Sequence, residues 1–300
     1  MTLSTESAER IALLYRAART NGALVSLEEL ARLLPEHTTE EELADAIAST
    51  PLLRSMFEVR SGFLTEHLEG ASDPLPREAL NRSTASKNLV QAADFVARLH
   101  SSGFGMVAVS GSTSYGSASL SKDIDLFCVA PTGRMWASLV RALLMARAYG
   151  ILHRGRPVIC LSCVMDEDYA CSAFESRRDS LFARDAIQAK VLKGQGIYQS
   201  LMERAPWISK LYPVAYRKAA RRGARANLGR PTRPDRILNR LIFETAGRYI
   251  RVKSSFLNRR LGSGSRFEVH CTESHLMYES RRYLALRDEY DSVLRSREMP

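Results

Sequence analysis

Two aspartates one residue apart are the residues best suited to chemistry in this 300-residue chain. Asp123 and Asp125 open an apolar segment that ends at Val129, and residues 106–109 before them are also apolar. Side chains of a strand alternate between its two faces, so both carboxylates should point to the same side. Neighbouring carboxylates repel each other unless a cation lies between them, and Mg²⁺ prefers hard oxygen ligands. We therefore expect Asp123 and Asp125 to bind Mg²⁺, or Mn²⁺ in its place.

A Gly-Ser turn between the two expected strands supplies a second chemical group. Gly111 and Ser112 follow the first strand and begin a short helix of small residues. The backbone N–H groups of such a turn and the serine hydroxyl can bind phosphate. Ser121 and Lys122, directly before the aspartates, are further candidates for phosphate contacts, although a lone lysine beside a strand is more often only solvated. Together these residues predict a site for a metal ion and a phosphate.

The pair Gly111-Ser112, then ten residues, then Asp123-x-Asp125 resembles the signature of the polymerase beta-like nucleotidyltransferase superfamily. The resemblance implies that the Gly-Ser pair holds the triphosphate of an NTP. It also implies that the two aspartates are catalytic and carry Mg²⁺ ions for attack of a hydroxyl on the α-phosphate. The alternative is a surface turn followed by a strand whose aspartates contact only solvent, because short motifs also occur by chance.

Members of that superfamily usually contribute a third carboxylate from a later strand. Here the expected strand covers residues 158–165 and contains no acidic residue, but Asp166 stands at its end as a candidate metal ligand. An ordinary acidic turn is the competing interpretation, and Glu175 and Asp185 are more distant candidates. If none of them reaches the site, the activity would be weak or lost.

The expected elements around this site give an α+β fold. A helix over 82–99, a strand at the Gly-Ser turn, the aspartate strand, a helix over 134–149 and the strand over 158–165 have the order implied for a nucleotidyltransferase core. We expect a mixed sheet with flanking helices in this core, between an N-terminal winged-helix-like domain and a C-terminal helical domain. The three expected domains cover residues 1–75, 80–170 and 171–300.

The N-terminal domain is predicted from three helices followed by a hairpin. Helical spacing and capping residues place the helices over 6–20, 26–33 and 39–48, and the hairpin within 52–67. Winged-helix domains often bind DNA, yet residues 1–80 hold seven arginines and no lysine against fourteen acidic residues, a net charge of −7. Acidic residues would face any phosphate; they include Glu28, Glu29, Glu40, Glu41 and Glu42. DNA binding by this domain is therefore not expected, and a structural or protein-contact role is favoured.

The opposite charge gathers near the C-terminus. Residues 210–260 hold fifteen basic residues against Asp235 and Glu244, which gives a net charge of +13. The whole chain has a net charge of +10, so the rest of it is slightly acidic. This exceeds what solubility requires and favours contact with RNA or with the phosphates of a nucleotide. Arginine outnumbers lysine in this stretch and suits bidentate phosphate binding. The residues expected to bind nucleic acid are Arg217, Lys218, Arg221, Arg222 and Arg225.

Composition is that of a globular protein, with 45% hydrophobic and 25% charged residues. No apolar run is as long as a membrane span and the N-terminus lacks a signal-peptide pattern, so we expect a cytoplasmic protein without a membrane partner. The five cysteines include Cys160 and Cys163, whose spacing resembles half of a zinc site. No second Cys or His pair follows at zinc spacing, so buried free thiols are expected.

Three functions remain open from the sequence. The first is a Mg²⁺-dependent nucleotidyltransferase that adds an NMP from an NTP to an RNA, of which a tRNA is one candidate. The second keeps the reaction but uses a small molecule or a protein as the acceptor. The third is a catalytically impaired protein that binds nucleotide or RNA and acts as a regulator. The basic stretch favours the first over the second, because a small acceptor needs no such field.

Overall fold

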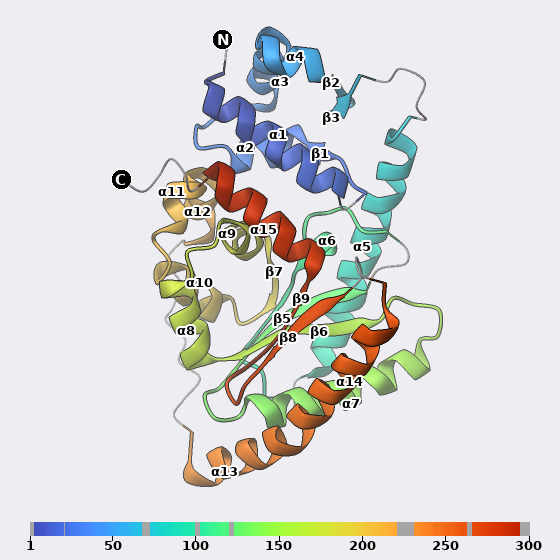
Figure 1. The fold of residues 1–300 in the computed structure, drawn as a ribbon, viewed down its shortest axis with the longest axis vertical. Helices are drawn as coiled ribbons and strands as arrows, with labels where there is room; N and C mark the ends of the chain where they lie inside the picture. The colour runs from blue at the N-terminus through green and yellow to red at the C-terminus, as the bar shows by residue number, and fades with distance from the viewer. Residues whose placement is uncertain are drawn as a thin grey trace.

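The computed structural model describes residues 3–20, 22–67, 73–99, 103–119, 123–220, 231–262 and 266–294 (Figure 1). The fold is a mixed α+β structure built on a mixed sheet, as the sequence predicts at this level. Five of the residues proposed above as phosphate or nucleic-acid contacts lie outside the described residues; they are Ser121, Lys122, Arg221, Arg222 and Arg225.

The N-terminal part contains the three predicted helices and a small sheet. Capping chemistry sets two of the helix starts: the Ser26 side chain accepts from the Glu29 N–H, and Thr39 forms a capping box with Glu42. The sheet has the antiparallel order β1-β3-β2. The elements are α1 (Thr5–Thr20), β1 (Val25–Ser26), α2 (Leu27–Leu33), α3 (Glu40–Ser49), α4 (Pro51–Met56), β2 (Phe57–Arg60) and β3 (Phe63–Glu66).

One prediction fails in this region. The first hairpin strand was expected to begin at residue 52, but Pro51–Met56 forms helix α4 and the strand begins only at Phe57. Pro51 occupies the first turn of α4, where its fixed φ suits a helix and its missing N–H costs nothing.

A six-stranded sheet in the order β7-β4-β5-β6-β9-β8 forms the centre of the molecule. Strands β5 and β6 are parallel, and every other neighbouring pair is antiparallel. Three of these strands come from the region predicted to be a helical domain, so the sheet crosses the expected boundary at residue 170. The strands are β4 (Met106–Val109), β5 (Ile124–Ala130), β6 (Ile159–Asp166), β7 (Lys190–Lys193), β8 (Phe267–Cys271) and β9 (His275–Ser280).

Helices cover both faces of this sheet. One face packs its apolar residues against α5 (Leu75–Arg98), α7 (Met135–Leu152) and α14 (Arg248–Arg260). The other face shares a core with the N-terminal part and with four further helices; these are α8 (Glu167–Ser176), α9 (Ser180–Gln188), α10 (Gln195–Glu203) and α15 (Arg281–Leu294). The shorter α11 (Ile208–Leu211) and α12 (Pro213–Ala219) pack beside this second group.

Two helices are longer than predicted. Helix α5 begins at Leu75 rather than near residue 82, because Pro74 and Pro76 fit its N-terminus and first turn. Helix α7 continues through Gly150 to Leu152. Within the described residues, α7 is the one helix whose length and apolar composition would suffice to cross a membrane, and a third of that helix is buried in the protein.

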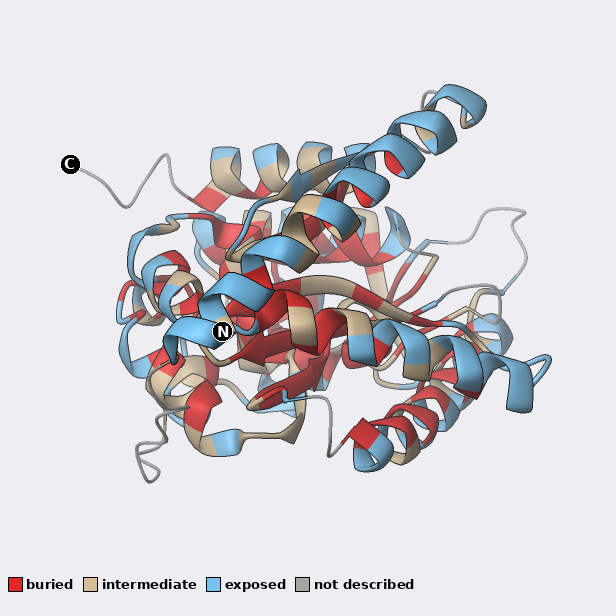
Figure 2. Ribbon diagram, turned by 90° about the horizontal axis from the view of Figure 1, so that it is seen from below, coloured by how far each residue is buried: buried red, intermediate tan, exposed pale blue. Residues whose placement is uncertain are grey.

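A long helix closes the lower end of the molecule in Figure 1. It consists of α13 (Arg233–Ile242), a π-helical turn over Phe243–Gly247 and then α14. Figure 2 views this end from below and shows many exposed residues in pale blue.

Candidate functional site

The Gly-Ser turn and the aspartates meet at one end of the central sheet. Strand β4 ends beside the start of β5, with Val109 opposite Leu126 in an antiparallel pair. The Ser110 N–H then donates a hydrogen bond of 2.9 Å to the Asp125 carbonyl oxygen. The turn residue Gly111 therefore lies directly beside Asp125.

Gly111 has a backbone conformation and a position that exclude a side chain. Its φ of +64° lies in the left-handed region, and a Cβ built on it would stand 3.0 Å from Oδ2 of Asp125. The glycine therefore lets the backbone approach the carboxylate closely. This closeness is what a turn needs in order to present N–H groups to a phosphate next to a carboxylate-bound metal ion.

Replacing Gly111 by alanine should reduce any nucleotide chemistry at this site by up to about tenfold, because the new Cβ adds backbone strain and pushes the Asp125 carboxylate by a few tenths of an ångström. Gly62→Ala is the matched control, since Gly62 has a φ of +78° but no atom within 4 Å of a built Cβ. Both variants carry the same backbone strain, so equal losses of activity in the two would contradict the role given to Gly111. Transfer rates and thermal melting of both proteins measure the difference.

The two aspartates share one face of β5. Ile124 between them is buried in the core that includes α5 and α7, so strand alternation turns Asp123 and Asp125 to the other side. Asp123 is exposed, yet the neighbouring protein displaces part of the water around its carboxyl group, and this desolvation raises its pKa. Asp125 is half-buried.

The neighbouring strand places a cysteine beside the aspartates. In the parallel pair of β5 and β6, Cys160 is the register partner of Asp125, and its thiol donates a hydrogen bond to the Asp125 carboxylate. Burial, followed by the charges of Asp125 and Asp123, raises the pKa of Cys160 to about 12, so the thiol stays neutral. From the sequence, Cys160 was expected only to be a buried free thiol. In the structure, Asp125 and Cys160 are each the second residue of their strands, and the register of these strands could not be read from the sequence.

Asp166 does not belong to this site, contrary to the expectation that it could be a third metal ligand. It lies opposite Ala130 at the far end of β6, six residues from Cys160, or about 20 Å at the rise of a strand. Its carboxylate caps α8 and accepts the Tyr169 N–H at 2.9 Å. The acidic-turn interpretation is therefore the correct one.

The other two acidic candidates also have structural partners. Glu175 forms an exposed ion pair with Arg204. Asp185 accepts a hydrogen bond from the Tyr115 hydroxyl, and burial raises its pKa to about 6. Within the described residues, no group of three or more His, Cys, Asp or Glu side chains could hold a metal ion. Two carboxylates still fit Mg²⁺, which proteins commonly bind through one or two carboxylates together with substrate phosphates and water.

A buried polar network supports the Gly-Ser helix α6 (Gly111–Ser114) from behind. Tyr115 follows this helix, and its hydroxyl donates a hydrogen bond to the Asp185 carboxylate of α9. The Arg184 guanidinium carbon lies over the Tyr115 ring, 4.6 Å from the ring centre. Arg184 in turn donates to Glu29 at 2.9 Å and to the Tyr290 hydroxyl at 2.7 Å. The network thus joins α2, α9 and α15 to the signature turn.

This network corrects the role expected for one acidic residue. Glu29 was grouped with the acidic residues that would repel phosphate from the N-terminal domain. The structure buries Glu29 against Arg184 and Gln188, whereas Glu28, Glu40, Glu41 and Glu42 remain exposed.

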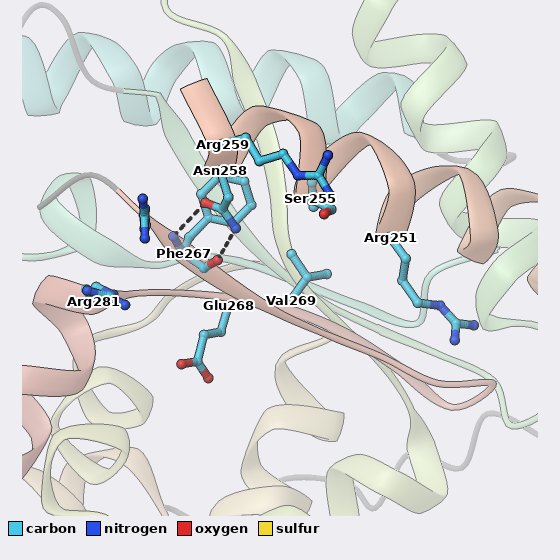
Figure 3. Close-up of a pocket in the computed structure, with 10 residues that line it drawn as sticks. Arg251, Ser255, Asn258, Arg259, Phe267, Glu268, Val269 and Arg281 are labelled. Carbon is cyan, nitrogen blue, oxygen red and sulfur yellow. Dashed lines mark hydrogen bonds between the residues drawn. The ribbon is translucent and has the colours of Figure 1, made fainter. Parts of the chain in front are cut away.

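The basic residues are distributed differently from the prediction. Arg217 and Lys218 are exposed on α12, which packs against α2, α9, α10 and α11 rather than against the central strands. A groove of about 530 Å³ between α14 and β8 is instead lined by four other arginines (Figure 3); they are Arg251, Arg259, Arg266 and Arg281. Within the described part of the chain, these four arginines form no ion pair with a carboxylate.

The groove lies at the same end of the sheet as the aspartates. Strand β9 runs antiparallel to β6, and Phe267 at the start of β8 pairs with Ser280 at the end of β9. The start of β8 therefore lies level with the starts of β5 and β6, three strand spacings or about 14 Å from Asp125. Phe267 is one of the residues that line the groove, and its backbone forms two hydrogen bonds with the Asn258 side chain of α14 (Figure 3).

No protein-family model, curated protein or solved structure matches this chain.

Proposed function

We propose that the protein is a Mg²⁺-dependent nucleotidyltransferase that moves an NMP from an NTP to a hydroxyl of RNA and releases pyrophosphate. The observation that carries the proposal is the contact between the left-handed Gly111 turn and the Asp125 carboxylate, with Asp123 two residues away on the same strand face. This geometry supports a turn that binds phosphate next to two carboxylates that bind a metal ion.

The sheet supports the fold that the resemblance implies. Strands β4, β5 and β6 are neighbours in chain order, with one antiparallel and one parallel pairing, and helices α6 and α7 connect them. This is the strand, helix, strand, helix, strand order expected for a nucleotidyltransferase core.

The proposed reaction is an in-line displacement at the α-phosphorus. The acceptor oxygen forms a bond to phosphorus, the bond to the bridging oxygen breaks, and pyrophosphate leaves with that oxygen. In this chain, the turn at Gly111 and Ser112 would hold the phosphates, while Asp123 and Asp125 would hold Mg²⁺. When bound, Mg²⁺ neutralises the charge that builds up on the phosphates. The proton of the acceptor hydroxyl passes to a base at the site. The candidates for this base are the carboxylates of Asp123 and Asp125.

The arginine groove supports RNA as the acceptor. Arginine guanidinium groups bind phosphates in a bidentate manner, and the four groove arginines lie about 14 Å from the aspartates at the same end of the sheet. Helix α14 packs on the face opposite the aspartates, so an RNA strand would cross the end of the sheet between groove and site. A small acceptor would have no use for a second anion-binding region at that distance.

The test is to incubate the protein with each α-labelled NTP and Mg²⁺, with and without total RNA, and to follow the label and pyrophosphate. The proposal predicts that label enters RNA and that pyrophosphate is released in equal amount. Label on a protein or a small molecule from cell extract would replace RNA as the acceptor. No pyrophosphate release with RNA or with extract would contradict transferase activity of any kind.

A catalytically impaired nucleotide- or RNA-binding regulator is the second candidate, and Cys160 favours it. Cys160 occupies the strand position beside Asp125, and its thiol donates to the Asp125 carboxylate. An acidic residue at this position would supply a third metal ligand, which the thiol does not.

Substituting Cys160 by aspartate should therefore raise the transfer rate by about tenfold or more, because it adds both a metal ligand and a candidate general base. The Cys160→Ser variant is the control, since serine has a similar size but adds no carboxylate. An unchanged or lower rate in Cys160→Asp, with unchanged thermal stability, would show that this position is not the missing carboxylate. Initial rates at saturating NTP measure the effect.

A further inference from the structure

An apolar stripe runs along the exposed side of the long helix made by α13, the π turn and α14. The side chains in this stripe are between 48% and 70% exposed; they are Ile237, Leu238, Leu241, Tyr249, Val252 and Phe256. Burial of apolar surface stabilises a protein or a complex by about 25 cal/mol per Å² removed from water. These side chains would gain that stabilisation only on binding another surface. A contiguous exposed apolar surface of this kind marks an interaction site.

The π turn keeps the stripe on one side of the helix. Ile237, Leu241, Thr245 and Tyr249 follow each other at intervals of four residues, and the π-helical segment Phe243–Gly247 lies within this run. An α-helix has 3.6 residues per turn, so four-residue spacing would drift around it, whereas the wider π turn compensates for the drift. Val252 and Phe256 continue the same side at helical spacing.

Helix α7 packs with its N-terminal end against α13 of the long helix. The two are joined by an ion pair of 2.7 Å between Arg134 and Asp235 and by a hydrogen bond of 2.7 Å from the Trp136 N–H to Asn239. They lie together at the lower end of the molecule in Figure 1. The exposed apolar side chains of α7 are Leu143, Leu144, Ile151 and Leu152. The stripe on α13 and α14, together with the basic residues of these helices, is called the basic apolar face below.

Positive charge surrounds the stripe. Residues 233–260 hold eight basic residues and two acidic ones, and both acids are neutralised: Asp235 by Arg134, and Glu244 by Arg248 at 3.1 Å. Helix α7 contains two arginines and no acid. Arginine side chains also lie over aromatic rings of the long helix, with Arg260 4.2 Å from the ring centre of Phe256.

We propose that the basic apolar face binds the surface of a lipid bilayer that contains anionic lipids. A bilayer interface accepts apolar side chains into the boundary of its hydrocarbon region and attracts arginine to its headgroups, so it matches both halves of the pattern. RNA would use the arginines but leave the apolar stripe in water. A second copy of the chain would bring two strongly basic surfaces together, because a two-fold interface pairs each face with itself.

This proposal departs from the expectation, drawn from composition, that the protein has no membrane partner. It concerns attachment to the bilayer surface and leaves α7 as a helix that covers the sheet, because Trp136, Leu139 and Ala142 of α7 are buried in the core. The face shares Arg251 and Arg259 with the groove proposed to bind RNA, but it includes none of Gly111, Ser112, Asp123 and Asp125, so vesicle binding can be tested separately from nucleotidyl transfer.

The test measures cosedimentation of the full chain with phosphatidylcholine vesicles, with and without phosphatidylglycerol. The protein should bind only the vesicles that contain phosphatidylglycerol, and salt should weaken the binding. Val252→Asp should reduce the bound fraction at least about tenfold, since it places a carboxylate in the interface against anionic headgroups. Leu52→Asp is the control, because Leu52 is 48% exposed on α4 in the N-terminal part, and this variant should bind as the native chain does.

Each alternative gives a distinct result. Failure of the native chain to bind phosphatidylglycerol vesicles at low salt would overturn the proposal, and so would equal binding by Val252→Asp. A native dimer that Val252→Asp converts into a monomer, without vesicle binding, would assign the face to a second copy. Loss of RNA binding in Val252→Asp without vesicle binding would assign it to RNA. Circular dichroism of both variants confirms that they fold.

Discussion

Replacing Asp125 by asparagine should reduce nucleotidyl transfer by about a thousandfold or more while leaving the protein folded. The substitution keeps the size of the side chain but removes the negative charge that would hold Mg²⁺ beside the Gly111 turn. A metal ion contributes several kcal/mol to phosphoryl-transfer transition states, and each 1.4 kcal/mol corresponds to about tenfold in rate. Single-turnover rates with labelled NTP and RNA give the loss directly.

Asp168→Asn is the matched control for Asp125→Asn. Asp168 is an exposed acid at the start of α8, at the other end of the sheet from Asp125, and its loss should leave the rate within about twofold of the native value. If Asp125→Asn retained most of the transfer activity, the reaction would have to be assigned to another site in the chain.

The second large effect concerns stability and the buried network behind the signature turn. Arg184→Met should lower the free energy of unfolding by about 3–5 kcal/mol, because it leaves the buried Glu29 carboxylate without its cation. It also removes the hydrogen bond to Tyr290 and the guanidinium above the Tyr115 ring. Urea unfolding followed by circular dichroism measures the difference.

Two further variants show whether the cost comes from an uncompensated charge. Arg204→Met breaks an ion pair with Glu175 whose side chains are about half exposed, and should cost less than about 1 kcal/mol. The double variant Glu29→Met with Arg184→Met should recover much of the stability lost in Arg184→Met, since the buried Glu29 carboxylate is then removed together with its cation. A double variant no more stable than Arg184→Met alone would contradict this explanation.

Local sequence patterns predicted the N-terminal helices and the closeness of Gly111 to Asp125. Ser26 and Thr39 cap the second and third helices as expected, because capping depends on residues only three positions apart. The meeting of Gly111 with Asp125 could also be predicted, since consecutive strands commonly pair in a sheet and an antiparallel pair places the end of one strand beside the start of the next. The N-terminal hairpin was placed too early because Pro51 was not recognised as the first residue of a helix.

Features that depend on distant pairing could not be read from the sequence. The Cys160 position beside Asp125 follows from the register of two parallel strands separated by helix α7, and no local pattern fixes that register. Strands β8 and β9 were included in a helical domain because their partner β6 lies more than a hundred residues earlier in the chain. The exposed stripe on α13 and α14 was likewise obscured, because charge counts over 210–260 do not show which side chains lack a partner.

The sheet order has a consequence for how the chain reaches its native state during synthesis. Strand β6 pairs with β9 and β4 pairs with β7, so the central strands keep open edges until residues from far later in the chain arrive. Tyr290, which bonds the arginine beneath the signature turn, follows Asp125 by more than 160 residues. A ribosome-bound chain that already contains Gly111, Asp123 and Asp125 therefore still lacks the parts that hold them in place until β9 and α15 have been synthesised.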